Sequence, residues 1–434
     1  MFGKHETDVL VVGAGPVGLF AALSLVHRGL RVEIIDEGWR PTMHSYAAAF
    51  HPRSLSLLDR VGVLEAALAR SIRIDHVVFY DAAAPRAAVR FADLPVAHPF
   101  AAVLRQDVIE NLLEEQLAER GVRVQWNHRL HRLRPAENFV TAEIDELEKM
   151  SCGYAVATAE WDIRRSKTTK AAFVIGADGY RSMVRRELGI EYPLIGQPDL
   201  FAVFEFETET DPGKDLSVVL SGTSSVMWPL PGRAGRWSFQ VSEGEPTLDA
   251  RDKNRLTVQV DSRSFPSLAR EELALLMRER APWFHARIDD VRWSILVRFE
   301  RRLADRFGYG RCWLVGDAGH MASPIGVQSM NVGIREADEV VTLIDRNLRG
   351  SSKLEAFDAY EAGRRREWGQ LLQTDGASLA DHGAAPWVRE NQARILGSIP
   401  AAGNDLAALL EQLHLGFKHE LEPTEATGSA VAGR

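Results

Sequence analysis

The order of apolar and polar positions at the start of the chain predicts a β-α-β unit. Residues 8–12 form an almost entirely apolar run, which is typical of a parallel strand covered on both faces. From residue 16 to residue 27 apolar side chains recur at helical spacing, and Gly29 ends that helix. A second apolar run at residues 31–35 closes on Asp36. Two parallel strands joined by a helix are therefore expected here.

After this unit, the sequence up to about residue 177 predicts two helices, a meander and another strand. Apolar spacing predicts outer-layer helices at about residues 53–68 and 107–120. Short alternating segments between about residues 140 and 173 predict a small meander. An apolar strand at residues 172–177 is then expected to return the chain to the main sheet.

A two-residue period dominates between about residues 192 and 297, for example at residues 201–206 and 236–241. This alternation predicts a second domain built on an antiparallel sheet. A strand-like run at residues 311–315 and a long helix at about residues 327–349 then return to the first pattern. That helix is expected to stop at Gly350.

Composition narrows the class of protein. The chain has 434 residues, of which 45% are hydrophobic and 26% charged, so it can bury a large core. A formal charge of -8 argues against a broad nucleic-acid footprint. The first residues do not read as a signal peptide, and no apolar run reaches the roughly 18 residues of a membrane span, so a cytoplasmic protein is expected. Cys152 and Cys312 are too few and too far apart for a metal cluster, and no metal is expected.

A glycine-rich turn joins the first strand to its helix. Gly13 permits a sharp exit from the strand, Gly15 lets the backbone approach a pyrophosphate, and Gly18 allows close helix packing. Asp36, at the end of the second strand, is placed to accept hydrogen bonds from an adenosine ribose. These features predict dinucleotide binding but do not distinguish NAD from FAD.

Two later turns favour FAD. Asp317 follows a strand and precedes a helix, so its carboxylate could bind ribityl hydroxyls while N–H groups near Met330 and Asn331 face the flavin pyrimidine. Helix capping is the alternative role for Asp317. Asp178 lies in a third turn, of the Asp-Gly type that also occurs in ordinary loops.

Together the three turns resemble the fingerprints of one enzyme family. GAGPVG with Asp36, GADGYRS at residues 176–182, and GDAGH with SPIGVQSMN are similar to those of the aromatic-ring flavoprotein monooxygenases, the para-hydroxybenzoate hydroxylase-like family, over about residues 5–350. The resemblance implies FAD as cofactor and NADH or NADPH as reductant. It also implies that oxygen adds at flavin C4a and that the distal hydroperoxide oxygen passes to a phenolic or polycyclic aromatic substrate.

The resemblance also assigns site residues. It implies that Arg105 contacts the ribityl or phosphate region, that Asp178 supports the pyrophosphate side and that Asp317 holds the ribityl chain. The expected cofactor-binding residues are Gly13, Gly15, Val17, Gly18, Asp36, Glu37, Arg105, Asp178, Gly316, Asp317, Pro324, Gly326, Met330 and Asn331.

Departures from the family pattern bear on mechanism. Val327 stands where the family has glycine, and a β-branched residue is not expected to take a positive φ there, which puts flavin motion in doubt. Tyr46 takes the place of a family arginine. Tyr46 and His51 are the candidates for groups next to the flavin, and neither is assigned as an acid or base. His320 is expected to be a packed or backbone-bonded histidine, and Trp228 a core residue of the sheet.

The predicted fold is α/β, with a doubly wound, glutathione-reductase-like Rossmann domain for FAD, an antiparallel-sheet substrate domain and C-terminal helices. The FAD-binding domain is expected at about residues 1–75, 100–190 and 298–350, and the substrate domain at about 76–99 and 191–297. A helical extension at 351–420 and a disordered tail at 421–434 complete the prediction.

Two further functions stay open from the sequence. One is an FAD-dependent reductase, dehydrogenase or epoxidase, to which Val327 and Tyr46 give weight. The other is a non-catalytic carrier that keeps only the first dinucleotide turn, which Asp317 and the helix after it disfavour. The expected partners are an aromatic small molecule and O2, without nucleic acid or membrane. The sequence leaves open the choice between a monomer and a homodimer.

Overall fold

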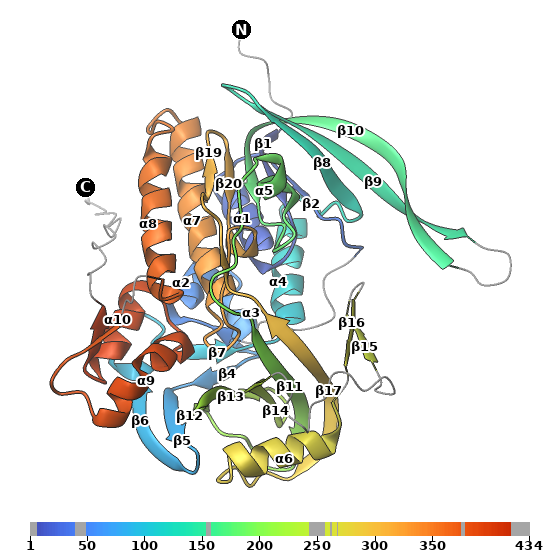
Figure 1. Cartoon of the computed structure of the whole chain (residues 1–434). Coiled ribbons are helices and arrows are strands. Elements are labelled where there is room, and N and C mark those ends of the chain that lie inside the picture. The colour runs from blue at the N-terminus through green and yellow to red at the C-terminus, as the bar shows by residue number, and fades with distance from the viewer. Residues whose placement is uncertain are drawn as a thin grey trace.

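The computed structural model describes residues 7–39, 49–152, 158–242, 257–260, 263–266, 268–374 and 378–417. Tyr46 and the predicted tail at 421–434 lie outside the described residues. Within the described chain, two large sheets lie one above the other, with helices packed around the first (Figure 1).

The first sheet holds the predicted β-α-β unit and has the strand order β19-β20-β10-β1-β2, with β8 and β9 added beside β10. Its central strands β20, β10, β1 and β2 are parallel, and Leu314, Gly176, Val12 and Ile35 form one row across it. The carboxyl ends of four strands therefore meet at one edge. The strands are β1 (Thr7–Val12), β2 (Val32–Ile35), β8 (His128–Pro135), β9 (Val140–Cys152), β10 (Thr158–Gly176), β19 (Gly308–Tyr309) and β20 (Cys312–Leu314).

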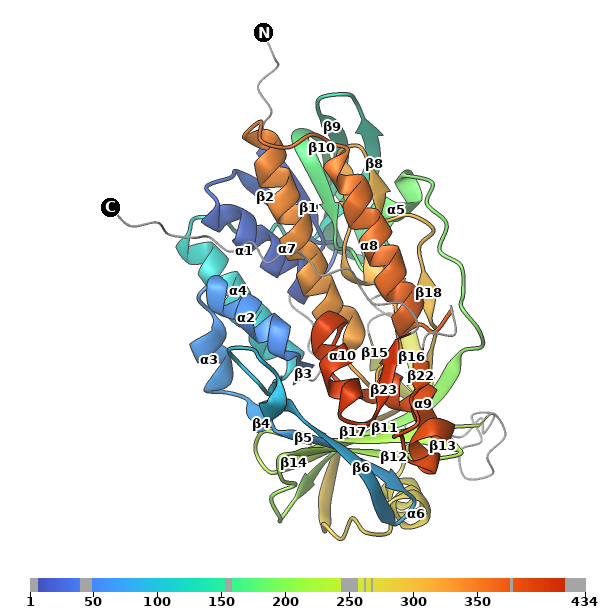
Figure 2. The ribbon, with the colours of Figure 1, turned by 90° about the vertical axis from the view of Figure 1, so that its left-hand side faces the viewer.

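Helices α1 (Pro16–His27), α4 (Gln106–Glu119) and α7 (Gln328–Leu348) cover one face of this sheet, and all three were predicted from apolar periodicity. Helix α1 packs against both α4 and α7, and they share a core with alternate residues of β1 and β10. Helix α8 (Ala356–Leu371) lies along α7 (Figures 1 and 2). The amphipathic periods of α1 and α7 thus mark the faces buried between sheet and helices.

The other face is covered by β8, β9 and the short helix α5 (Met183–Glu187), which bury a second apolar cluster. The predicted small meander is wrong in extent, because β9 and β10 form a long antiparallel arm that projects from the body (Figure 1). The end of β10 at 171–176 is continuously buried within the sheet, and this part carries the apolar run, whereas residues 161–168 are mostly exposed. The exposed part of β10 has no apolar run, so the sequence pattern did not predict that the strand extends through it.

A second correction concerns the helix predicted at residues 53–68. Two helices, α2 (Pro52–Arg60) and α3 (Leu64–Leu68), stand there instead. Gly62 between them has a φ of +76°, which a continuing helix cannot accommodate. Nearby, β3 (Ala49–Phe50), β7 (Ala101–Val103) and β4 (Ile72–Ile74) form a small sheet.

The second sheet has the order β17-β11-β14-β13-β12-β5-β6. It is antiparallel as predicted except that β12 and β5 pair in parallel, because β5 enters from a distant part of the chain. Helix α6 (Arg270–Arg280) covers the outer face, and the inner face shares its core with the first sheet's helices. The strands are β5 (His76–Asp81), β6 (Ala84–Arg90), β11 (Asp199–Thr208), β12 (Asp215–Ser221), β13 (Thr223–Leu230), β14 (Ala234–Val241) and β17 (Ile288–Phe299).

The last described segment packs beside the second sheet (Figure 2). Helix α9 (Pro386–Ser398) contacts β12 and β6, and α10 (Gly403–Glu411) contacts β6. The remaining short elements are η1 (Phe91–Asp93), β15 (Thr257–Val260), β16 (Arg263–Pro266), β18 (Arg302–Leu303), η3 (Gly316–Ala318), β21 (His320–Met321), β22 (Ser378–Ala380) and β23 (Leu415–Phe417). Among the described helices, none is long and apolar enough to cross a bilayer.

Candidate functional site

The first glycine turn leaves space where a dinucleotide phosphate could lie. A Cβ added to Gly13 would lie 2.3 Å from the carbonyl oxygen of Ala177, and one on Gly18 would lie 2.0 Å from that of Gly13. Gly13 also has a φ of +104°. Gly15 has no atom within 4 Å of its added Cβ. The outer glycines are therefore required for chain packing, while Gly15 leaves the amino end of α1, with its free N–H groups, open to an anion.

Asp36 lies against this turn. Its Oδ2 accepts a 2.7 Å hydrogen bond from the N–H of Ala14, and its Oδ1 accepts one of 2.7 Å from the N–H of Gly38. Burial raises the pKa of Asp36 against the effect of these two bonds, which lower it. Because each carboxylate oxygen can accept two hydrogen bonds, one site on each oxygen is left for a ribose hydroxyl. Glu37, the next residue, is exposed.

Asp178 binds N–H groups in the first turn of helix α5, and one of its oxygens has no hydrogen-bond partner among the described residues. Its Oδ2 accepts bonds from the N–H groups of Met183 (2.7 Å) and Val184 (3.1 Å). Its Oδ1 is buried and has no hydrogen-bond partner in the part of the chain that the structure describes. Burial raises the pKa of this carboxyl. A buried acceptor without a donor fits a cofactor hydroxyl or a bound water beside the first turn.

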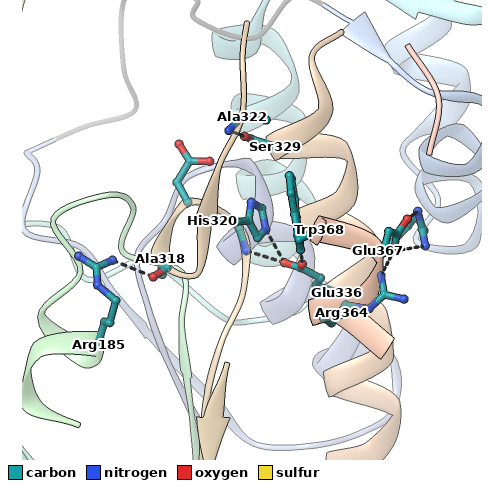
Figure 3. Close-up of polar contacts among 12 residues, drawn as sticks. Arg185, Ala318, His320, Ala322, Ser329, Glu336, Arg364, Glu367 and Trp368 are labelled. Atoms are coloured by element: carbon teal, nitrogen blue, oxygen red, sulfur yellow. Dashed lines mark hydrogen bonds and ion pairs between the residues drawn. The ribbon is translucent and has the colours of Figure 1, made fainter. Parts of the chain in front are cut away.

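The Gly-Asp turn, η3, is held from two sides (Figure 3). Arg185 donates from Nη1 to the carbonyl oxygen of Ala318 at 2.7 Å, and Tyr192 donates to that of Asp317 at 3.0 Å. On the other side, the N–H of Gly316 donates to Oε2 of Glu336 at 3.0 Å. The backbone of the turn is therefore held by three residues from different parts of the chain: Arg185 of α5, Tyr192 of the following loop and Glu336 of α7.

The side chain of Asp317 is left free to meet a ligand. It is exposed and makes no hydrogen bond to any described residue. Nevertheless, the surrounding protein raises the pKa of its carboxyl. An exposed carboxylate without a hydrogen-bond partner among the described residues is available to accept hydrogen bonds from a ligand's hydroxyls, as ribityl binding requires.

Close packing brings the first and last motifs together. A Cβ on Gly333 of α7 would lie 2.7 Å from Cα of Gly316 and 3.0 Å from Cγ2 of Val17. Val17 is buried between the two motifs, with its Cγ2 3.2 Å from the Cβ that Gly316 lacks. The side chain of Val17 therefore packs the two turns against each other.

The segment before α7 is pinned by Asn331 and His51. Asn331 accepts from the N–H of His51 at 2.8 Å and donates from Nδ2 to the carbonyl oxygens of Ala49 (2.9 Å) and Val327 (2.8 Å). His51 Nε2 lies 3.0 Å from the carbonyl oxygen of Gly326, so this nitrogen is the donor. Burial lowers the pKa of His51 to about 3, so the ring is neutral. Both residues bond to backbone in this structure.

Two neighbours complete the segment. Gly326 has no room for a side chain, because an added Cβ would lie 2.8 Å from the carbonyl oxygen of Gly397 on α9. Met330 is buried, and Pro324 is half-buried in the turn that precedes α7. Helix α7 has no side-chain cap, so its first N–H groups are free for a ligand.

The expectation that Val327 avoids a positive φ is wrong. Val327 has φ +49° and ψ +42° at the start of α7, a left-handed conformation that is rare for a β-branched residue. Such a conformation costs about 1–3 kcal/mol and persists only where the surroundings impose it. The hydrogen bond from Asn331 to the Val327 carbonyl, together with that from His51 to Gly326, imposes it here.

Val327→Gly is expected to relieve this strain and to change how fast the flavin is reduced. Glycine takes the left-handed conformation freely, so the urea midpoint of the apoprotein should not fall, and the segment should move more easily. We expect the rate of flavin reduction by NAD(P)H, measured in a stopped-flow spectrometer, to change about twofold or more. Ala82→Gly is the control, because Ala82 also has a positive φ (+48°) but lies in the β5–β6 turn. Equal reduction rates in Val327→Gly and wild type would contradict the prediction.

Arg105 lies between the two sheets. It is the N-cap residue of α4, and its guanidinium contacts Asp107 (3.1 Å) and Glu205 of β11 (3.3 Å). Glu205 also accepts a 2.8 Å bond from Arg236 of β14, and both of these residues are buried. The structure therefore places Arg105 at a three-residue ion-pair chain that joins the first half of the fold to the inner face of the second sheet.

The ion pair Glu205–Arg236 lies between two tryptophans on that face. Register places Trp293, Glu205, Arg236 and Trp228 in one row across β17, β11, β14 and β13. Trp228 is buried in the core that faces the first sheet, as predicted, while its neighbour Met227 faces outward. Sequence analysis did not identify this ion pair. The sequence did contain one indication of it. Glu205 is a charged residue on the side of the 201–206 strand that otherwise carries apolar residues, and a buried charge needs a partner.

His320 is buried and packed, as expected. Its ring stacks on Trp368 with centroids 3.8 Å apart, and Nε2 lies 2.8 Å from Oε2 of Glu336 (Figure 3). Sequence analysis did not identify Glu336 or Trp368 as site residues. Within the described residues, no group of three His, Cys, Asp or Glu side chains could hold a metal ion.

Comparison with known sequences agrees with this geometry. The sequence model of the family described as "FAD binding domain" matches residues 6–375. A 6-methylpretetramide 4-monooxygenase from Streptomyces rimosus is 30% identical over 380 residues, which cover 86% of this chain and 62% of that protein. A pentachlorophenol 4-monooxygenase from Sphingobium chlorophenolicum is 28% identical over 382 residues, which cover 85% of this chain and 63% of that protein. The chain thus spans less than two thirds of each relative's length.

Solved structures share the fold. A p-nitrophenol 4-monooxygenase from Pseudomonas putida has a TM-score of 0.67 at 20% identity, covering 94% of this chain and 96% of that chain. A flavin-dependent monooxygenase in complex with FAD and substrate has a TM-score of 0.67 at 20% identity, covering 94% of this chain and 68% of that one. The predicted α/β fold class is confirmed.

Proposed function

The chain belongs to the FAD-binding domain family of the aromatic-ring flavoprotein monooxygenases, and from that premise we propose that it hydroxylates an aromatic small molecule. FAD is the cofactor, NADH or NADPH the reductant, and O2 the second substrate. One observation carries the proposal: three turns far apart in the sequence meet at the strand-end edge of the first sheet, and the Asp317 carboxylate has no hydrogen-bond partner among the described residues.

Residues of the chain divide the binding task along this edge. The free N–H groups of α1 at the glycine turn bind the pyrophosphate, and Asp36 binds the adenosine ribose. Asp317 binds the ribityl hydroxyls. The uncapped amino end of α7 then lies where its partial positive charge favours electron density on the flavin pyrimidine. When bound and reduced, FAD supplies the redox chemistry that activates oxygen for transfer to the ring.

The inner face of the second sheet is proposed as the wall of the substrate site. The side of this sheet that faces the first sheet is aromatic and aliphatic, with Trp228, Trp293, Phe201 and Ile295 on the same side of their strands. Flat aromatic side chains favour flat ring substrates. The Glu205–Arg236 pair is the one charged pair in the row between these tryptophans, and it offers a polar contact for a ring hydroxyl. A phenol, single or within fused rings, fits this wall.

Oxygen labelling tests the proposed reaction. The purified protein should be yellow, and phenolic and polycyclic phenolic compounds should stimulate its NAD(P)H oxidation. Under 18O2, the product should carry one labelled oxygen atom. Product without label would support the alternative of a reductase or dehydrogenase, and a labelled three-membered ring would support an epoxidase. A colourless protein that cannot be reconstituted with FAD would support the non-catalytic carrier.

We further propose that the protein acts in the cytoplasm, where reduced nicotinamide is supplied. It is proposed to work as a monomer or homodimer, without nucleic acid, in keeping with its formal charge of -8. Light scattering of the FAD-loaded protein distinguishes the two oligomeric states, and a constant mass in the presence of duplex DNA is expected.

A further inference from the structure

The strongest polar cluster outside the motif turns lies between η3 and helix α8, and Glu336 is at its centre. Glu336, on α7, is fully buried and accepts three hydrogen bonds. Its Oε2 accepts from the N–H of Gly316 (3.0 Å) and from His320 (2.8 Å), and its Oε1 accepts from Trp368 (2.8 Å; Figure 3). One side chain thus joins the Gly-Asp turn, β21 and α8.

We propose that Glu336 is a positioning residue for the FAD site, which holds the Gly-Asp turn so that Asp317 faces the ribityl chain. This inference rests on the proposed FAD site. It adds that helix α8, beyond the three motifs, is part of the support of that site.

The chemistry of Glu336 suits this task. All three of its partners donate an N–H, and a carboxylate accepts without having to donate. Burial raises the pKa of Glu336, but contacts with His320, Trp368 and Arg364 outweigh it, so that the pKa lies below its ordinary value. The group is therefore an anion at neutral pH, and hydrogen bonds to an anion are stronger than those to a neutral acceptor.

The position of the bond to Gly316 explains why it controls Asp317. Arg185 and Tyr192 hold the turn only through its carbonyl oxygens. Glu336 holds the opposite side, through the N–H directly before Asp317. Gly316 has a φ of +63°, and glycine, which has no side chain, populates positive and negative φ about equally, so the bond from its N–H helps to fix this conformation.

Helix α8 fixes Glu336 in turn. Trp368 both donates to Glu336 and stacks on His320. The preceding residue, Glu367, binds Arg335 of α7 at 2.8 Å and Arg364 at 2.6 Å. The Arg335–Glu367 ion pair therefore joins α8 to α7, while Arg364, on α8 itself, pairs with the same carboxylate. This contact between the helices helps to set where the indole N–H lies. The segment expected as a separate C-terminal extension begins with a helix that supports the cofactor turn.

Glu336→Gln tests the proposal. Glutamine replaces one acceptor oxygen by an NH2 group, which would face an N–H donor. We expect the dissociation constant for FAD to rise about tenfold, measured by flavin fluorescence on titration of the apoprotein. At metal sites, losing a residue that supports a ligand lowers affinity by about 10- to 100-fold, and we take the lower end of that range. Glu339→Gln is the matched control, because Glu339 lies one turn further along α7, is part-exposed and contacts Arg364 at 3.5 Å. It should change the constant by less than about twofold.

Two further variants separate positioning from simple loss of fold. Glu336→Asp keeps the anion and should recover part of the FAD affinity. Trp368→Phe keeps the ring on His320 and removes only the donor to Oε1, so a rise of about threefold is expected, and this variant decides the matter if Glu336→Gln does not fold. Wild-type affinity in both Glu336→Gln and Trp368→Phe would overturn the inference. Wild-type protein that never binds FAD would instead overturn the proposed function.

Discussion

Asp317→Ala is expected to raise the dissociation constant for FAD by about 10- to 100-fold without destabilising the apoprotein. Hydrogen bonds to a charged group contribute about 1.5–3 kcal/mol each, and alanine removes the acceptors for the ribityl hydroxyls. The same carboxylate bonds to no described residue, and the surrounding protein raises its pKa. Fluorescence titration of the apoprotein with FAD gives the affinity, and urea unfolding of the apoprotein gives the stability.

The sign of the stability change makes this test specific. A raised pKa means that the fold disfavours the ionised form of Asp317, so its removal should leave the urea midpoint of the apoprotein unchanged or slightly higher. Asp305→Ala removes another exposed carboxylate, next to Ala304, whose N–H bonds to Gly319 directly after the turn, and it should leave FAD binding unchanged. An Asp317→Ala protein that binds FAD like wild type would show that this carboxylate lies outside the cofactor site.

Glu205→Gln is expected to lower the free energy of unfolding by about 3–5 kcal/mol. Removing one partner of a buried ion pair leaves the other charge without compensation, and Arg236 is buried with Glu205 as its only carboxylate partner among the described residues. Arg105 loses one of its two carboxylate contacts at the same time. Urea unfolding followed by tryptophan fluorescence measures the loss, since Trp228 and Trp293 flank the pair.

Glu207→Gln is the matched control on the same strand. Glu207 is two residues along β11, on the same side as Glu205, and pairs with Arg292 at 2.7 Å where both side chains are solvent-accessible. An exposed pair contributes about 0–1 kcal/mol. Similar losses in the two variants would mean that the Glu205 pair is no more important than a surface contact, and the role of the Arg105–Glu205–Arg236 chain in joining α4 to the second sheet would fail.

Elements with a local signal were predicted well. Helix α1 spans the predicted residues because Pro16 starts it and an apolar period marks its buried face. Helix α7 was predicted to within about two residues for the same reason. The predictions failed where a local pattern was interrupted, at Gly62 between α2 and α3 and along the exposed arm of β10. A single glycine ends α2 although the apolar spacing continues past it. In β10 the apolar run covers only the buried end of a much longer strand.

The three motifs carried the identification of the family, since each combines a strand, a turn and a helix in a few consecutive residues. The family match over residues 6–375 confirms that identification. Tyr46, the predicted substitute for a family arginine, lies outside the described residues, so its place near the flavin stays a prediction.

By itself, the sequence determined the β-α-β unit, the glycine turns, the acids that follow them and hence the class of cofactor. Those features depend on neighbours within a few residues, so composition and spacing reveal them. The tertiary structure alone decided that Glu336 holds Gly316, that Glu205 joins Arg105 to Arg236, and that Val327 is held in a left-handed conformation. The contacts behind these three features join residues as far as 275 positions apart. A charged residue at a buried position shows that a partner is needed, but only folding shows which residue that partner is.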